Sequence, residues 1–294
     1  MALDGEQLQT LASVIRCGSF EKAGEQLGIT QSAVSQRIRQ LEQRTGLVLV
    51  VRGQPCRATE AGERLFRHAE EVALMERDLL VDLGRAPLSA WPTLRLAITA
   101  DSLATWFAEA MAAVDGLLFD VILDDQDHSA EWLRRGEVRA AVSALAEPVH
   151  GCDCLPLGAL VYRATASPAF ARRWFADGVT AESLSRAPCL TFNAKDGLQA
   201  SWLRQVTGRA LQPPTHWLPA SQAFLDGARL GLGWGMNPEK LAAPLIASGA
   251  LIDLRPEAPL AVPLYWHWSR SMSKTLAPVT GAVLKAARAT LSFV

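Results

Sequence analysis

The stretch FEKAGEQLGITQSAVSQRIRQLE, residues 20–42, decides the fold of the N-terminal part of the chain. Its apolar residues recur at helical spacing in two groups, and Gly28 lies in a short turn between them. Thr30 stands just before the second group and can cap a helix there. A short helix, a tight turn with glycine and a second helix form a helix-turn-helix, whose second helix enters the major groove of DNA. The apolar positions are Phe20, Ala23 and Leu27, then Val34, Ile38 and Leu41.

The flanking residues extend this motif to a winged domain, which we place at residues 1–60. An apolar periodicity over residues 8–15 predicts a preceding helix with Asp4 as its cap, and Ser19 can cap the helix that follows. After the motif, the apolar run at 47–51 predicts a strand. The six residues after that run predict a small hairpin or wing.

A long helix follows the winged domain. Residues 59–83 form one helical pattern whose apolar seam alternates steps of four and three residues. The sequence GRAPLSAWP at 84–92 then breaks the helix with two prolines. We therefore expect a linker helix and hinge at residues 61–92, and an exposed seam of this kind predicts self-association. The seam consists of Leu65, Ala69, Val72, Leu79 and Leu83, with Glu76 between Val72 and Leu79 as its only polar member.

From residue 93 onward, short apolar runs alternate with helical stretches. Such alternation predicts a parallel sheet that is covered by helices. Strands are expected at 94–98, 119–123, 140–145, 157–166, 189–192, 230–236 and 264–268, and helices from about residues 102, 131, 198 and 278.

Length and charge set limits on the function. The chain has 294 residues, of which 49% are hydrophobic, enough for two or three folded units. Lys and Arg total 29 against 30 for Asp and Glu, so any nucleic-acid site must rest on local charge. The five cysteines are too few, and odd in number, for a disulfide scaffold, and reduced thiols are expected. Cys152 and Cys154 lie near His150 without the usual ligand spacing, so neither a metal nor another cofactor is expected.

The sequence also lacks the common signatures of enzymes and of membrane proteins. It contains no Gly-x-Ser-x-Gly elbow, no phosphate-binding Gly-x-x-x-x-Gly-Lys loop and no Gly-x-Gly-x-x-Gly turn, so no enzyme is expected. No run of 18 apolar residues occurs, which argues against a membrane span. Asp4 and Glu6 precede any apolar run, unlike in a secretory signal, and a cytoplasmic location is expected.

Residues 20–42 resemble the N-terminal domain of LysR-type transcriptional regulators, and the resemblance extends over the whole chain. It implies an α and α/β fold, in which a winged helix-turn-helix and a long linker helix precede two α/β Rossmann-like subdomains of periplasmic-binding-protein type, joined by two crossing strands. The effector subdomains are expected at 93–163 with 265–294, and at 164–264. Four stretches resemble the branch of the family that senses basic amino acids, the ArgP/LysG-like regulators of lysine and arginine export. They are ADSLATW at 100–106, LRRGEV at 133–138, LGAL at 157–160 and LYWH at 264–267.

The second helix of the motif carries most of the predicted DNA contacts. Polar side chains opposite its apolar positions can contact base edges, and the free N–H groups after Thr30 suit a phosphate. Residues 30–57 include five basic side chains and one acidic side chain, which gives this region a local positive charge. The alternative is a solvated helix face with a surface hairpin. The expected contacts are Thr30, Gln31, Ser32, Ser35, Gln36, Arg37, Arg39, Arg52 and Arg57.

Two positions depart from the pattern of the family that the chain resembles. Val50 and Val51 stand where many members have an aromatic residue near the start of the wing. Gln36 stands where the family often has a basic residue. Both departures leave the preferred base sequence open.

Ligands of open α/β sheets bind at the carboxyl ends of strands, so the effector is expected at the strand-to-helix junctions. Ser102 and nearby amides could hold an α-carboxylate and Asp101 an α-ammonium group, although either residue could only cap a helix. The side chain of lysine or arginine needs a carboxylate, from Asp196 or from Asp124 and Asp125, a pair that the resemblance favours and that could also be a solvated strand end. The expected set is Ala100, Asp101, Ser102, Asp124, Asp125, Phe192, Asn193, Asp196, Ser221 and Gln222.

Two features leave this expectation less specific. The neutral Gln222 stands where relatives often have an acidic residue, which weakens the argument for a cationic ligand. Four tryptophans could form the wall of the cleft, although tryptophans in strands more often belong to the core. They are Trp106, Trp234, Trp266 and Trp268.

We therefore expect a transcription regulator in which effector binding biases the closure of the two subdomains and thereby the spacing of its DNA half-sites. Its expected partners are double-stranded DNA, L-lysine or L-arginine, further copies of itself in a dimer or tetramer through the linker helix, and RNA polymerase. The implied target is an amino-acid exporter gene. One alternative is a regulator of the same architecture that senses another small metabolite. The other is an amino-acid-binding module whose DNA domain is vestigial.

Overall fold

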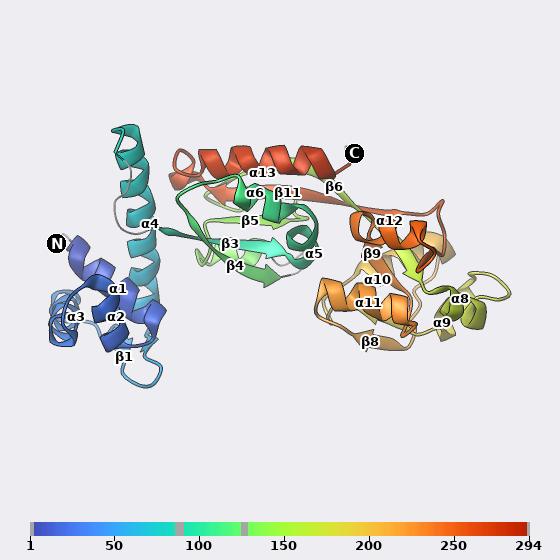
Figure 1. Cartoon of the computed structure of the whole chain (residues 1–294), viewed down its shortest axis with the longest axis horizontal. Helices are drawn as coiled ribbons and strands as arrows, with labels where there is room; N and C mark the ends of the chain where they lie inside the picture. The colour runs from blue at the N-terminus through green and yellow to red at the C-terminus, as the bar shows by residue number, and fades with distance from the viewer. Residues whose placement is uncertain (1–2, 86–90, 125–128, 293–294) are drawn as a thin grey trace. The chain divides into compact units, whose positions relative to one another are not determined.

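The structure of the chain, a computed structural model, describes three stretches, residues 3–85, 91–124 and 129–292 (Figure 1). Part of the predicted hinge at 84–92 lies outside them. No helix within these stretches has the length and apolarity to cross a membrane. The chain divides into two compact units, Met1–Leu94 with Gly116–Leu118 and Arg95–Asp115 with Phe119–Val294.

The first unit contains the predicted helix-turn-helix. The side chains of Asp4, Ser19 and Thr30 each accept backbone N–H groups from the first turn of the helix that follows, as their positions in the sequence indicate. Thr59 caps the long helix in the same way. The elements of this unit are α1 (Gly5–Cys17), α2 (Phe20–Leu27), α3 (Gln31–Thr45), β1 (Val50–Val51), β2 (Arg57–Ala58) and α4 (Glu60–Asp82).

The turn between α2 and α3 depends on two glycines. Gly28 has a φ of 66°, in the left-handed region that residues with a side chain rarely adopt. Gly24 lets the turn approach α2, since a Cβ at this position would lie 2.7 Å from the carbonyl oxygen of Ile29. Apart from Leu27, which is half-buried, the turn brings the two predicted apolar groups into one core with Leu11, Val14, Leu49 and Val50.

The strand predicted at 47–51 is shorter than expected. Only Val50–Val51 pairs with Arg57–Ala58, while Leu47 and Val48 are 54% and 66% exposed. The backbone N–H of Leu49 donates instead to Glu42 Oε1 at 2.8 Å, so a side chain of α3 replaces a strand partner. The wing is therefore a short hairpin that starts directly against the end of α3.

The long helix α4 uses its apolar seam in two ways. Its first half packs on α1, where Ala69 and Phe66 join Leu8 and Ala12 in a buried cluster. Arg16 on α1 also pairs with Glu70 on α4, with a nitrogen-to-oxygen distance of 3.3 Å. Toward the other end of α4, Leu79 and Val81 are 58% and 52% exposed, and Leu83 just beyond it is 65% exposed. The first half of the seam thus packs within the first unit, and the second half is exposed on the surface of that unit.

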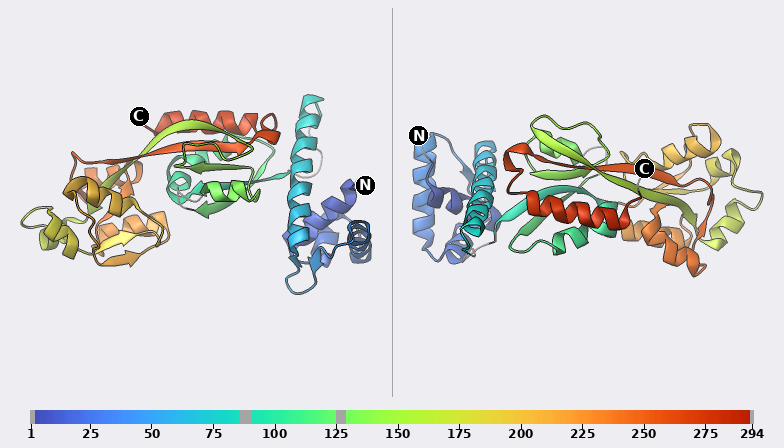
Figure 2. Two further views of the ribbon diagram at one scale, coloured as in Figure 1. Left: turned by 180° about the vertical axis from the view of Figure 1, so that it is seen from behind. Right: turned by 90° about the horizontal axis from the view of Figure 1, so that it is seen from above.

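The second unit is built on one seven-stranded sheet with the order β10-β6-β11-β5-β3-β4, in which β9 also pairs with β6. Strands β6 and β11 are the longest, and they run side by side from one lobe of the unit to the other (Figure 2). Residues before β6 and after β11 form the first lobe, and residues between β6 and β11 form the second. The strands of this sheet are β3 (Thr93–Thr99), β4 (Leu118–Asp124), β5 (Ala140–Ser143), β6 (Cys152–Ala166), β9 (Gly235–Pro238), β10 (Ile252–Asp253) and β11 (Leu260–Ser269).

The prediction of a parallel sheet is correct only in part. Strand β3 pairs with β5 in parallel, but β11 is antiparallel to both β5 and β6, and β9 and β10 are antiparallel to β6. The reason is that β6 leaves the first lobe and β11 returns to it, so these two neighbouring strands must run in opposite directions. Both begin several residues earlier than the apolar runs that predicted them.

The strand predicted at 230–236 is mostly wrong. Helix α11 (Ser221–Leu230) ends there, and Gly231, with a φ of 82°, reverses the chain before β9 starts at Gly235. Gly233 lies in the intervening turn, where a Cβ would meet Leu190 at 2.9 Å. The glycines that interrupt this apolar run permit a tight turn against the core, which the apolar pattern alone does not indicate.

The helices cover both lobes. In the first lobe, α6 and α13 pack on each other, and α13 also packs on β6 (Figure 1). Several elements of the second lobe have no counterpart in the sequence prediction, namely α8 (Pro168–Trp174), α9 (Ala181–Arg186), β8 (Thr215–Trp217), α12 (Glu239–Ala247) and β10. The remaining elements of the unit are α5 (Ala100–Ser102), the π-helix Leu103–Phe107, α6 (Ala108–Ala112), α7 (Ser129–Arg134), α8 (Pro168–Trp174), α9 (Ala181–Arg186), β7 (Cys189–Thr191), α10 (Leu198–Thr207), β8 (Thr215–Trp217), α12 (Glu239–Ala247), the 3-10 turn Arg270–Met272 and α13 (Ala277–Thr290).

Three of the four tryptophans belong to the core. Trp106, Trp234 and Trp266 are fully buried, and Trp266 packs near Phe107 with 6.1 Å between ring centroids. Trp268 is partly buried, and its indole N–H donates to Ser273 at 3.0 Å. The core interpretation of these residues therefore holds, because none of them lines the cavity described below.

Candidate functional site

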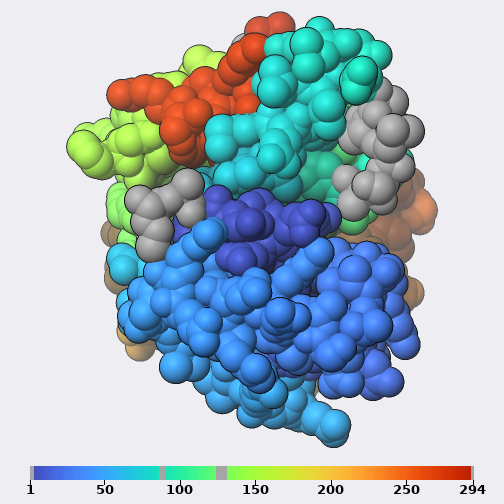
Figure 3. Space-filling view, turned by 90° about the vertical axis from the view of Figure 1, so that its left-hand side faces the viewer, coloured from blue at the N-terminus to red at the C-terminus, as the bar shows by residue number. Residues whose placement is uncertain are grey.

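Helix α3 presents a polar face on the first unit. Gln31, Ser32, Gln36 and Arg39 are exposed, and Ser35 is half-buried beside them. At 100° per residue these five positions span about 140° on one side of α3, next to the side that carries the buried Val34, Ile38 and Leu41. Residues 1–60, in blue, fill much of the face seen in Figure 3. The structure thus brings together the base-contacting side chains that the sequence predicts.

The basic residues of the predicted interface differ in their exposure and in the residues that they contact. Arg39 and Arg57 are exposed. The guanidinium of Arg52 lies 5.0 Å from the ring centroid of Phe20, at the start of α2, so a cation–π contact orients it. Arg37 departs from the group, because it lies on another side of α3 and pairs with Glu6 of α1 at 2.6 Å.

A second polar site lies between the lobes of the second unit, around Asp101. Its Oδ1 accepts the hydroxyl of Ser221 at 2.8 Å, and its Oδ2 accepts the hydroxyl of Tyr162 at 2.9 Å. Asp101 belongs to α5 in the first lobe, Ser221 begins α11 in the second lobe, and Tyr162 lies on the crossing strand β6. Three parts of the fold therefore meet at one carboxylate.

The capping of α5 explains why the carboxylate of Asp101 can face the second lobe. Thr99, not Asp101 or Ser102, caps α5, because its hydroxyl oxygen accepts the N–H of Ser102 at 3.1 Å. The hydroxyl of Thr99 in turn donates to that of Ser102 at 2.7 Å, and Ser102 is fully buried. Asp101 is thus free to face the other lobe, whereas Ser102 is held inside the first.

A small cavity adjoins Asp101. Its volume is about 20 Å³, which holds about one water molecule. Two of its walls carry carboxylates, Asp101 and Asp196, and the described lining contains no basic side chain. Burial raises the pKa of Asp101, the hydroxyls of Ser221 and Tyr162 counteract this, and the charge of Asp196 raises it further. The lining residues are Asp101, Phe192, Asp196, Leu198, Ser221, Phe224, Met236, Asn237 and Pro238.

Asp196 also shapes the loop between β7 and α10. Its Oδ2 accepts the N–H of Phe192 and its Oδ1 that of Leu198, each at 3.0 Å. Asn193 accepts the N–H groups of Lys195 and Asp196, at 2.7 and 3.2 Å. Asn193 therefore supports the loop, and Asp196 belongs to both the loop and the cavity wall.

Other predicted effector residues lie elsewhere or are not described. Gln222 is exposed, and its amide donates to Asp226 at 3.3 Å on the same helix. Ala100 begins α5 and is absent from the lining of the cavity. Asp124 ends β4, but its side chain and the whole of Asp125 lie outside the description. The acidic pair thus stays a prediction.

The sequence analysis missed Tyr162 and Asn237. Both are almost fully buried polar residues, on β6 and β9, and the amide of Asn237 donates to Thr165 at 2.9 Å. One signal was available, since a tyrosine inside a buried strand needs a hydrogen-bond partner for its hydroxyl. The partner could not be inferred, because Asp101 lies 61 positions away in the sequence.

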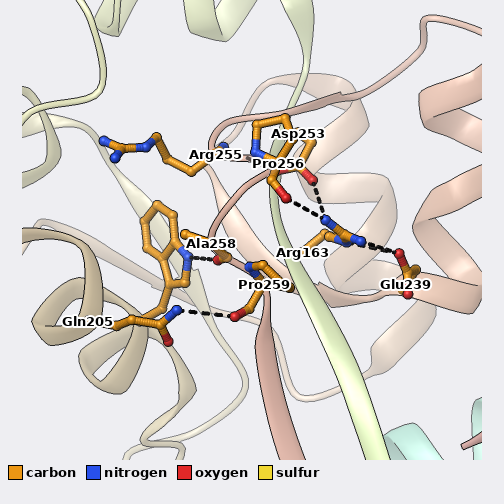
Figure 4. Close-up of polar contacts among 9 residues, drawn as sticks. Arg163, Gln205, Glu239, Asp253, Arg255, Pro256, Ala258 and Pro259 are labelled. Atoms are coloured by element: carbon orange, nitrogen blue, oxygen red, sulfur yellow. Dashed lines mark hydrogen bonds and ion pairs between the residues drawn. The ribbon is translucent and has the colours of Figure 1, made fainter. Parts of the chain in front are cut away.

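A network of polar contacts fixes the end of β11 in the second lobe (Figure 4). Arg163 on β6 pairs with Glu239 at 2.6 Å and donates to the Pro256 carbonyl at 2.9 Å. Trp202 and Gln205 of α10 donate to the carbonyls of Ala258 and Pro259, at 2.8 and 3.2 Å. These contacts attach the segment that leads into β11 to both β6 and α10.

The described cysteines and histidines form no metal centre. Within the three described stretches, no group of His, Cys, Asp and Glu side chains is arranged to hold a metal ion. All five cysteines are free thiols. Cys154 contacts the buried His267 at 3.6 Å, but burial raises the pKa of this thiol and lowers that of the imidazole. Both groups therefore favour their neutral forms.

A helix-turn-helix with an exposed polar recognition face, followed by a two-lobed unit with a polar cavity between its lobes, defines a DNA-binding protein with a ligand-binding domain. The chain belongs to the LysR family of bacterial regulatory helix-turn-helix proteins, which it matches over residues 6–63. The LysR substrate binding domain matches residues 92–288.

Two relatives and two solved structures are similar over almost the whole chain. The HTH-type transcriptional regulator LysG of Mycobacterium bovis is 45% identical over 285 residues, 97% of this chain and 94% of the relative. The lysine export transcriptional regulatory protein LysG of Corynebacterium efficiens is 41% identical over 288 residues, 97% and 98% of the two chains. ArgP from Mycobacterium tuberculosis has a TM-score of 0.78 at 44% identity, over 100% of both chains. Full-length LysG from Corynebacterium glutamicum with bound effector Arg has a TM-score of 0.65 at 38% identity, over 99% and 100%.

Proposed function

We propose that this LysR-family regulator binds L-lysine or L-arginine between its two lobes, changes its engagement of DNA in response, and controls a gene for an amino-acid exporter. It acts in the cytoplasm, without catalytic activity. The observation that carries the proposal is the small cavity that Asp101 and Asp196 line without a basic residue in its described walls. The similarity to a LysG structure with bound arginine, and to a lysine export regulator, supports the choice of ligand and target.

The cavity chemistry favours a ligand with positive charge. Asp101 and Asp196 both line the cavity, and an ammonium or guanidinium group can pair with a carboxylate through charge-assisted hydrogen bonds. Asp101 is the expected partner of the α-ammonium group. Asp196, with Asp124 and Asp125 as further predicted contacts, is expected to bind the side chain.

The start of α11 suits the α-carboxylate of the ligand. Its N-cap residue Ala220 offers no side-chain hydrogen bond, so backbone N–H groups of the first turn lack a capping partner. Ser221, the first residue of α11, lines the cavity. An anion at this position gains from both the N–H groups and the helix dipole.

Effector binding requires the lobes to move. A cavity of about 20 Å³ holds about one water molecule, which is far less than lysine or arginine occupies. The contact of Ser221 with Asp101 spans the two lobes, so it must lengthen to admit the ligand. Binding therefore selects a lobe arrangement other than the one described, as a ligand that shifts a population must.

The uncovered end of α4 is the proposed contact with a second copy. Its exposed Leu79, together with Leu83 just beyond the helix, continues the apolar seam of α4, and Val81 is exposed on another side of the helix. On the same unit, a groove of about 370 Å³ runs along α1 and α4 to Trp91. Pairing of two α4 helices would cover this surface and place two α3 helices on adjacent DNA half-sites. A tetramer and a contact with RNA polymerase are parts of the same proposal.

A thermal-shift screen of the full-length protein against the twenty amino acids tests the proposed ligand. A ligand at 100 times its Kd stabilises the folded state by about 2.7 kcal/mol. We expect a shift with lysine or arginine and none with leucine or glutamate. A shift with another small metabolite alone would contradict the ligand assignment and leave the regulator class intact. DNA binding that survives deletion of residues 1–60 would overturn the regulator assignment.

A further inference from the structure

The carboxylate of Asp101 has two hydrogen-bond donors of different origin. Ser221 belongs to the second lobe, so its 2.8 Å contact depends on how far apart the lobes stand. Tyr162 belongs to β6, one of the two strands that join the lobes. The Ser221 contact therefore varies with the position of α11, and the Tyr162 contact with the position of the crossing strand β6.

Tyr162 is held firmly by the sheet around it. Its backbone position pairs with Leu260 of β11 on one side and with Pro238 of β9 on the other. The residue is 2% exposed, so its ring has little freedom. A buried phenol hydroxyl needs a partner, and Asp101 Oδ2 is that partner at 2.9 Å.

We propose that Tyr162 is a positioning residue of the effector site, whose hydroxyl keeps the Asp101 carboxylate directed into the cleft and ionised while the lobes separate to admit the ligand. The ligand cation then meets a carboxylate that is already oriented, and Ser221 is the donor that is released. This inference rests on the proposed function for the identity of the ligand, but not for the contact itself.

The electrostatic surroundings define a readout that packing alone does not affect. Among the described residues, the titratable groups facing Asp101 are Tyr162 on β6 and Asp196 on the loop before α10, while Ser221 on α11 and Asn237 on β9 are neutral. Hydrogen bonds to an ionised carboxylate lower its pKa. Removing the Tyr162 hydroxyl must therefore raise the pKa of Asp101, which burial has already raised.

The variant Tyr162→Phe tests the inference, and Tyr265→Phe is its matched control. These are the two tyrosines of the chain, one on each crossing strand, and Tyr265 does not line the cavity. Lysine and arginine affinities of the full-length proteins are measured by calorimetry across a pH series. In Tyr162→Phe we expect about ten- to hundredfold weaker binding, and an acid loss of affinity that begins at higher pH. Tyr265→Phe should match the wild type in both.

A ligand-free measurement keeps this inference separate from the proposed function. Carbon-13 NMR of labelled aspartate follows the titration of Asp101, whose signal is assigned by its loss in Asp101→Asn. Its pKa should be higher in Tyr162→Phe than in the wild type. An unchanged pKa would overturn the inference even if lysine and arginine bind. A raised pKa without lysine or arginine binding to the wild type would contradict the proposed function alone.

A second substitution covers the case in which Tyr162→Phe does not fold. Incorporating 3-fluorotyrosine at both tyrosines makes each hydroxyl a stronger donor and keeps the shape of the ring. The pKa of Asp101 should then fall, which is the opposite shift. If fluorination leaves the titration of Asp101 unchanged, Tyr162 does not control the carboxylate.

Discussion

The recognition helix and the effector cleft present their functional side chains in opposite ways. Helix α3 exposes its polar face within 15 consecutive residues, and its apolar face is buried in the same unit. The cleft instead joins α5, β6, α11 and the loop after β7, and its carboxylates face a cavity of about 20 Å³. Under the proposed function, the DNA site is preformed and exposed, whereas the effector site has to open to admit its ligand. We propose that this opening allows the cleft to act as a switch.

The largest expected effect concerns Asp101. Asp101→Asn removes the charge that pairs with the ligand cation and keeps the size of the side chain. We expect the Kd for lysine or arginine to rise about a hundredfold, or ~2.7 kcal/mol. Calorimetry measures this value, and a gel shift without effector should show unchanged DNA affinity. Loss of effector-free DNA binding in this variant would contradict the assignment of Asp101 to the effector site alone.

The next effect concerns base recognition by α3. Arg39→Ala should cost about 1–3 kcal/mol on the preferred sequence, and much less on unrelated DNA. Gln36→Ala and Ser35→Ala should likewise erode sequence preference. Fluorescence anisotropy on specific and scrambled duplexes measures the difference. An equal loss on both duplexes would mean that α3 contacts only the backbone of DNA.

A smaller effect distinguishes two arginines of the first unit. Arg52→Ala should weaken binding to every sequence and reduce the slope of log K against log salt by about 0.9. Arg37→Ala is the matched control, because Arg37 pairs with Glu6 away from the polar face of α3. It should leave the slope unchanged in a gel-shift salt titration. Identical slopes for both variants and the wild type would remove Arg52 from the interface.

The smallest effect concerns neighbouring residues of α11. Gln222 is exposed and bonded to Asp226, so Gln222→Ala should change the free energy of ligand binding by less than about 0.5 kcal/mol. Ser221→Ala, one position earlier, should change it measurably, because Ser221 lines the cavity. Calorimetry on both variants decides the point. A larger effect of Gln222→Ala would show that α11 turns in the ligand-bound state.

The contrast between the two sites also explains what could be predicted from the sequence. The caps Asp4, Ser19 and Thr30, the turn at Gly28 and the polar face of α3 follow from local spacing, and the structure confirms the helices that they predict. Arg37 was grouped with the DNA contacts by its charge. At 100° per residue, its angle around the helix separates it from the other predicted contacts of α3.

The cleft could be predicted only in part. Asp101, Phe192, Asp196 and Ser221 were expected from the ends of strands and starts of helices, and they line one cavity. Tyr162 was missed because its partner depends on how β6 passes the first lobe, which no local pattern encodes. In the strand wrongly placed at 230–236, Trp234 and Met236 are buried but Leu230 and Leu232 are exposed, because α11 ends at Leu230 and a turn follows it.

The central claim is that a ligand held at Asp101 changes how α3 engages DNA. Its most direct test is a DNase footprint of the full-length protein on a duplex that it selects from random sequences, with and without saturating lysine or arginine. The account predicts a footprint that changes in extent or in hypersensitive positions for the wild type and stays fixed for Asp101→Asn. Identical wild-type footprints at saturating effector would contradict it.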